Sequence, residues 1–187
     1  MKKIIYALIA ILTVYSFIGN CLADQNPLPL PPHLNSLPSI PVEAWVKIED
    51  NPQTFLEGPA FDRDGNLFIT SLFEGRVIKI AADKTVQTVF QNNELITDGI
   101  AIHKDGRLFI GCLNGKVVSI QPDGTGLTYI EPRHEGKPVS SNDLVFDRHG
   151  NLYVTDFTGT LADPSGGVYR FSSDFSEVRP VISALWP

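Results

Sequence analysis

The chain has 187 residues, enough for one domain of ordinary size, and with 43% hydrophobic and 19% charged residues its composition is that of a globular protein. The formal net charge is −6 and Lys and Arg form no basic cluster, which argues against a nucleic-acid-binding surface. Two cysteines are too few for a disulfide framework.

The first 23 residues have the layout of a secretory signal peptide. Two lysines follow Met1, an uncharged apolar run covers residues 4–18, and the small residue Ala23 precedes a polar segment. We expect cleavage after Ala23, no stable membrane span afterwards, and an extracytoplasmic (periplasmic or secreted) product. The alternatives are a membrane anchor, for which the run is short, and a lipidated Cys21, for which Asn20 is a poor lipobox residue.

Residues 24–43 contain six prolines and are expected to form an extended arm, because proline disfavours both helix interiors and central strands. From residue 44 onward the chain repeats one pattern, in which a short apolar strand leads to a turn glycine and a second strand follows. The three copies are 57–70, 98–111 and 142–155. Their turn glycines recur every 41 to 44 residues, which is the period of a β-propeller blade.

Each repeat divides into four short strands. The second strands are expected at 67–70, 108–111 and 152–155, the third at 76–80, 116–120 and 168–171, and the fourth at 86–90, 127–130 and 178–182. We therefore predict an all-β fold over residues 44–187, a β-propeller with blades at about 57–90, 98–131 and 142–182. An antiparallel sandwich is the alternative, but it does not require three copies in register.

A closed propeller typically has four to eight blades, and the sequence contains three. We expect the chain to be a fragment of a longer protein. Self-association of two copies to close a ring is the alternative.

The repeat also predicts a site. Glu57, Asp98 and Asn142 each lie eight residues before their turn glycine, at the start of the innermost strand of a blade. Innermost strands line the central channel, so the three side chains should converge there. Carboxylate and amide oxygens suit a hard divalent cation. The competing interpretation is that Asp98 and Asn142 only form turns.

A second register follows six residues after the turn glycine, at Ser71, Cys112 and Asp156. Asp156 either supports the site from behind or is an ordinary surface carboxylate. His134 lies in the loop leading to Asn142, where a substrate contact is one interpretation. His103 and His149 flank hairpin turns and are expected to be solvated.

Two stretches resemble a known family. Glu57-Gly58-Pro59 with Asp64-Gly65-Asn66-Leu67-Phe68, and the segment from Asn142 to Phe157, are similar to blades of the gluconolactonase, senescence marker protein and luciferin-regenerating enzyme family. The run from Pro164 to Arg170 resembles its drug-responsive lactonases in particular. The similarity covers roughly Glu57 to Pro187.

The resemblance implies a six-bladed propeller that hydrolyses lactones with one divalent cation, most often Ca²⁺, with Mg²⁺, Mn²⁺ or Zn²⁺ as alternatives. It assigns Glu57 as a metal ligand and Asn142 as a residue near the substrate. From the repeat itself we also expect Asn142 to be able to bind the metal and Asp98 to contact the substrate. The family's later-blade Asn and its acid/base Asp would come after Pro187. The drug-responsive lactonases are not exported, so the signal peptide is a departure. A non-catalytic propeller segment that binds a ligand or partner is the alternative function.

Overall fold

The computed structural model describes residues 31–34, 38, 42–49, 51, 54–160, 162 and 164–185. The chain divides into two compact units, Met1–Ala44 and Trp45–Pro187. In the first unit, one turn of 3-10 helix, η1 (Pro32–Leu34), occurs where an extended arm was expected. The predicted signal peptide lies outside the described residues. Within the described ranges, no helix is long and apolar enough to cross a membrane.

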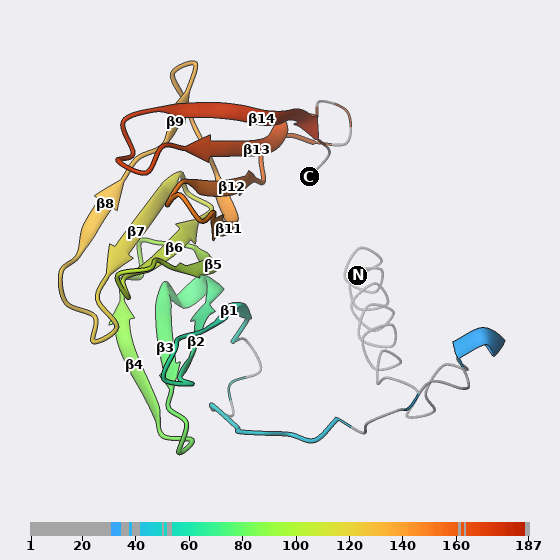
Figure 1. The fold of residues 1–187 in the computed structure, drawn as a ribbon, viewed down its shortest axis with the longest axis vertical. Helices are drawn as coiled ribbons and strands as arrows, with labels where there is room; N and C mark the ends of the chain where they lie inside the picture. Colours follow the sequence, from blue (N-terminus) through green and yellow to red (C-terminus); the bar gives the residue numbers. More distant parts are fainter. Residues whose placement is uncertain are drawn as a thin grey trace, which may run out of the picture. The chain divides into compact units, whose positions relative to one another are not determined.

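The second unit is built from β-sheet. Figure 1 shows three sheets of four strands that follow one another along the chain, and in each sheet the strands pair antiparallel in sequence order. The first blade contains β1 (Leu56–Phe61), β2 (Leu67–Ser71), β3 (Arg76–Ile80) and β4 (Val86–Gln91). The second contains β5 (Thr97–Ile102), β6 (Leu108–Cys112), β7 (Lys116–Ile120) and β8 (Thr128–Ile130).

The third blade contains β11 (Ser141–Phe146), β12 (Leu152–Asp156), β13 (Gly166–Phe171) and β14 (Val178–Leu185). A two-stranded hairpin, β9 (Arg133–His134) with β10 (Lys137–Pro138), precedes it, and one 3-10 turn, η2 (Leu72–Glu74), follows β2. The prediction of an all-β propeller built from four-stranded blades is confirmed, and the predicted β3 and β7 bounds match residue for residue.

The repeated turn motif has a local cause. In the first blade, Asp62 Oδ1 accepts the backbone N–H groups of Asp64 and Asn66, and Asn66 Nδ2 donates to Asp62 Oδ2 at 2.7 Å. Asp147 and Asn151 make the same pair of interactions in the third blade. These bonds reinforce the backbone hydrogen bonds that also close each turn, and together they fix the register of the hairpin that carries the innermost strand.

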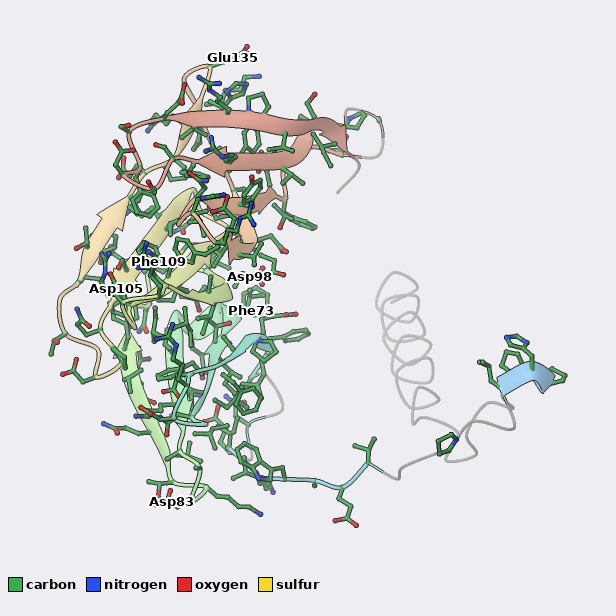
Figure 2. All side chains as sticks on the ribbon, in the orientation of Figure 1. Phe73, Asp83, Asp98, Asp105, Phe109 and Glu135 are labelled. Carbon is green, nitrogen blue, oxygen red and sulfur yellow. The ribbon has the colours of Figure 1, made fainter. Side chains whose placement is uncertain are left out.

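The core lies between neighbouring blades and follows the two-residue period of β6. Leu108, Ile110 and Cys112 join the cluster that faces the first blade, whereas Phe109 joins the cluster that faces the third. Phe109 is labelled in Figure 2 and packs edge-on against Phe146 with ring centroids 5.0 Å apart. Each large side chain buried in this way contributes about 1.5–3 kcal/mol, so interblade packing holds the inner strands in place.

Candidate functional site

The innermost strands of the three blades, β1, β5 and β11, lie side by side, with β5 in the middle. Each one shows a break in register near its start, between Glu57 and Ala60, between Thr97 and Ile100, and between Ser141 and Leu144. Such bulges bend a strand and redirect its side chains, and they are frequent beside active sites. The repeated bulge coincides with the positions that the sequence analysis singled out.

Two glycines let these strands approach closely. Gly58 has a φ of +55°, and a Cβ built on it would lie 2.5 Å from the carbonyl oxygen of Asp98. A Cβ on Gly99 would lie 2.6 Å from Oδ1 of Asp143. A larger side chain at either position would collide with the neighbouring inner strand. The two glycines therefore allow Glu57, Asp98 and Asn142, at the starts of these strands, to lie close together.

The three predicted residues meet in one pocket. Glu57, Asp98 and Asn142 line a cavity of about 320 Å³ together with Asp143 and the backbone at Gly58, Pro59 and Gly99. Figure 2 shows Asp98 at the edge of the sheets where the innermost strands lie. Glu57 is exposed to solvent at this pocket, whereas only 7% of the Asp98 surface is exposed.

Asp98 is held on two sides. The side-chain amide of Asn142 donates a hydrogen bond of 2.9 Å from Nδ2 to Asp98 Oδ2, and Thr70 Oγ1 donates to the Asp98 carbonyl at 2.8 Å. Burial, followed by the nearby charges of Glu57 and Asp143, raises the pKa of Asp98 to about 6. The pocket therefore concentrates negative charge that protein groups compensate only in part.

The donor set fits a hard divalent cation, because carboxylate and amide oxygens are its preferred ligands. Among the described residues, however, no group of three or more Asp, Glu, His or Cys side chains is arranged to hold a metal ion. A cation in this pocket would rely on Glu57, on the amide oxygen of Asn142 and on further ligands. The individual roles of Glu57, Asp98 and Asn142 remain predictions.

Asp143 lines the same pocket and was missed from the sequence. The repeat contains a usable signal, since Asp143 occupies the position that Gly58 and Gly99 hold in the other two blades. Asp143 is therefore the only one of these three equivalent residues that has a side chain. Its backbone N–H is bonded to Thr155 Oγ1 at 2.9 Å, which anchors the start of β11 to β12.

Asp156 and His134 do not line the pocket of Glu57 and Asn142. They line a second pocket, about 360 Å³ in volume, between the β9–β10 hairpin and the third blade. Asp156 accepts the Ser140 N–H at 2.9 Å and the Thr158 hydroxyl at 3.0 Å. It thus fixes the backbone two residues before Asn142.

The remaining residues considered from the sequence, His103, His149 and Cys112, line neither pocket. His103 was expected to be solvated, and this is wrong, because its ring packs 4.9 Å from Phe146 and Nδ1 lies 2.9 Å from Asp105 Oδ1. His149 is exposed, as expected. Cys112 is fully buried, and burial raises the pKa of its thiol to about 12. That thiol is not a nucleophile at neutral pH.

Comparison with known proteins agrees with this architecture. A lactonase drp35 from Staphylococcus haemolyticus is 40% identical over 157 residues, which cover 81% of this chain and 48% of the relative. A lactonase drp35 from Staphylococcus saprophyticus is 36% identical over 168 residues, covering 87% and 51%. The chain thus spans about half the length of the curated relatives it matches.

Solved structures show the same fold. A gluconolactonase from Xanthomonas campestris superposes with a TM-score of 0.60 at 25% identity, over 70% of this chain and 48% of that one. The calcium-binding protein regucalcin from Agrobacterium tumefaciens superposes with a TM-score of 0.56 at 19% identity, over 74% and 46%. The family model described as SMP-30/Gluconolactonase/LRE-like region matches residues 55–185. With this match over more than half of its length, the chain belongs to the SMP-30/gluconolactonase/LRE-like family.

Proposed function

We propose that this chain forms part of a lactonase that opens small cyclic esters with the help of a bound divalent cation. Lactone hydrolysis is the activity named for its drp35 relatives and for the gluconolactonase neighbour. The observation that carries the proposal is the convergence of Glu57, Asp98 and Asn142 from three successive blades in one pocket. Ca²⁺ is the cation we favour, because the available ligands are all oxygens.

The hydrogen bond between Asn142 and Asp98 determines which atom Asn142 can offer. An ionised carboxylate only accepts hydrogen bonds, so the amide must present Nδ2 to Asp98 and keep Oδ1 free. Asn142 is therefore a cation ligand in this proposal, and not an N–H donor to the substrate. Glu57 supplies the charged ligand. A bound cation would polarise the lactone carbonyl as a Lewis acid.

The residues of this chain hold and orient, and a general acid/base is expected from a later blade. Asp98 is too confined to reach a substrate freely, because it is 7% exposed and bonded to Asn142. We assign it a positioning role. This division of roles is consistent with a chain that spans about half of its relatives.

Calorimetric titration with CaCl₂ tests the proposal. We expect the full chain to bind Ca²⁺ at one site, and Glu57→Gln to weaken binding at least tenfold (about 1.4 kcal/mol), because the substitution removes a negative charge that attracts the cation. Glu131→Gln, which changes an exposed carboxylate away from the pocket, serves as the control. Equal affinities for both variants, or no binding by the wild type, would contradict the metal assignment.

A lactonase also requires turnover. Hydrolysis of δ-valerolactone should be followed by pH-stat in the chain alone and in a product extended through the later blades. We expect Ca²⁺-dependent activity in the extended product and its loss in Glu57→Gln. Ca²⁺ binding without hydrolysis in the extended product would favour the alternative function, a non-catalytic propeller segment that binds a ligand or partner.

The outward face of the third blade supports the fragment proposal. Val145 is 62% exposed and lines a shallow apolar depression with Leu144, Tyr153 and Val168. In a propeller, a following blade covers this face. Light scattering measures whether the chain alone is a monomer or self-associates. For the extended product we expect a monomer.

We also propose export. The support is the sequence of residues 1–23 alone, namely the basic start, the apolar run and Ala23. N-terminal sequencing of the protein recovered from a host with a secretory pathway should begin at Asp24. A product that retains Met1 would refute the proposal.

A further inference from the structure

The second pocket is a built cavity with its own polar groups. One wall is the β9–β10 hairpin, with His134 and Lys137, and the opposite wall is the third blade, with Asp156, Thr158 and Tyr169. Its volume of about 360 Å³ is within the usual range for small-molecule sites. The pocket of Glu57 and Asn142 has none of these residues in its lining.

Tyr169 contributes a polar aromatic side chain to the lining of this pocket. The residue is 92% buried, as only 8% of its surface is exposed, and yet its phenol makes no hydrogen bond to any described residue. The hydroxyl is not one of the buried polar atoms that lack a partner, so it is not sealed inside the core. Because Tyr169 lines the cavity, its hydroxyl can bond to a polar group that enters it.

The ring surfaces form a platform beside that hydroxyl. His134 and Tyr169 lie with their ring centroids 5.2 Å apart at an interplanar angle of 53°. Two adjacent rings of this kind offer an apolar surface to a flat or chair-shaped ring compound, while their polar edges remain available for hydrogen bonds.

Asp156 supplies acceptors on the same side. Its two oxygens accept one hydrogen bond each, from Ser140 N–H and from the Thr158 hydroxyl, and each oxygen has capacity for a second. It is half-buried and has no ion-pair partner among the described residues. The nearby carboxylates of Asp156 and Glu135, together with burial as the main cause, raise the pKa of Tyr169. Its hydroxyl therefore remains a donor at neutral pH.

The charges in the lining are of both signs. Glu135 and Asp156 carry negative charge and Lys137 carries positive charge, and none of the three is ion-paired within the described residues. A strongly charged ligand would meet a like charge on one wall. A neutral ligand with several hydroxyl groups can donate to the carboxylates and accept from Tyr169 and Lys137 at the same time.

From these contacts we infer that the pocket between the β9–β10 hairpin and the third blade is a second binding site, for neutral ring compounds that carry several hydroxyl groups. The site requires Tyr169 as donor, Asp156 as acceptor and His134 as part of the platform. It is independent of Ca²⁺ and of lactone hydrolysis, so its test does not depend on either.

The test is an NMR titration of the full chain, without added metal, using D-glucose as the probe. We expect saturable shifts of the Tyr169 and His134 ring resonances. Tyr169→Phe, which removes one hydroxyl, should weaken binding about five- to tenfold, as expected for one lost hydrogen bond. Tyr153→Phe is the matched control, because Tyr153 lies on the neighbouring strand β12 and lines a different pocket.

Two charged probes of similar size complete the design, cyclohexylammonium and cyclohexanecarboxylate. Shifts caused by glucose and reduced in Tyr169→Phe support the inference. Saturable binding of only one charged probe, or equal glucose affinity in Tyr169→Phe and Tyr153→Phe, overturns it. A site with a Kd of about 10 mM would be nearly saturated at about 200 mM glucose. Shifts that remain linear in glucose concentration up to that point therefore also overturn the inference.

Discussion

Asn142 Nδ2 donates a 2.9 Å hydrogen bond to Asp98 Oδ2, and this single contact joins the candidate sites of the second and third blades. The two residues lie 44 positions apart, one repeat of the sequence. The bond gives the amide one orientation and supplies a partial counter-charge to a carboxylate that is nearly inaccessible to water. The site is thus defined by a relationship between blades rather than by any one strand.

Replacement of Asp98 separates orientation from charge. Asp98→Asn keeps an oxygen that can accept from Asn142, whereas Asp98→Ala removes the acceptor. We expect Ca²⁺ affinity to fall about threefold in the first variant and at least tenfold in the second. The Asn142 side-chain NH₂ resonances of the metal-free protein give an independent readout. They should stay shifted in Asp98→Asn and move to ordinary values in Asp98→Ala; identical behaviour of the two variants would argue against positioning.

The raised pKa of Asp98, caused mainly by burial and also by Glu57 and Asp143, predicts a pH-dependent stability. The folded protein holds this proton up to about pH 6, whereas the carboxyl of the unfolded chain releases it near its ordinary pKa of 3.8. The Asp98 contribution therefore destabilises the fold as pH rises from about 4 to 6. Relative to the wild type, the free energy of unfolding of Asp98→Asn should rise by on the order of 1–3 kcal/mol between pH 4 and pH 7.

Urea unfolding at both pH values measures that difference. Saturating Ca²⁺ should reduce it, because a cation in the pocket favours the ionised carboxylate. A constant difference between the two proteins across pH would refute the link to Asp98.

Gly58→Ala should be strongly destabilising. The backbone at +55° is unfavourable for alanine by about 1–2 kcal/mol, and its Cβ would lie 2.5 Å from the Asp98 carbonyl oxygen. We expect a total loss of about 2–4 kcal/mol in urea unfolding. Gly65→Ala is the control, because Gly65 also has a positive φ, +81°, but nothing lies within 4 Å of its Cβ position. If both variants lose the same free energy, the close approach of β1 and β5 is not the cause.

The thiol of Cys112 should be unreactive in the folded protein. It is fully buried and its pKa is raised to about 12, chiefly by burial. In a Cys21→Ser background, Ellman's reagent should label no thiol under native conditions and one thiol in guanidinium chloride. Fast native labelling would show that the packing of β6 between the first and third blades is looser than described.

The fold was predictable because its signal is repeated. Asp62 with Asn66 and Asp147 with Asn151 encode the same turn twice, and both turns form the same side-chain hydrogen bond in the structure. The middle copy has His103 and Arg107 at these places, and there Asp105 bonds to Arg107 instead. The turn glycines and the repeated short apolar runs between them then placed the strands.

The site was predictable only in part. Spacing alone placed Glu57, Asp98 and Asn142 together, because equivalent positions of neighbouring blades are adjacent in space. It could not assign Asp156 or His134, whose location depends on the path of an irregular hairpin between blades. Packing of His103 against Phe146 depends equally on contacts between blades, which a single repeat does not reveal.

The position of the second blade has a further consequence for the dynamics of the fold. Within the described residues, β6 is buried along its whole length because a blade covers each of its faces, whereas β1 and β11 keep exposed positions. Local opening is easiest where a sheet has one unprotected side. Amide protons of β6 should therefore exchange with deuterium most slowly, and the protection should decrease in both directions along the row of blades. The most persistent part of the molecule would then be its middle, with Asp98 at its edge.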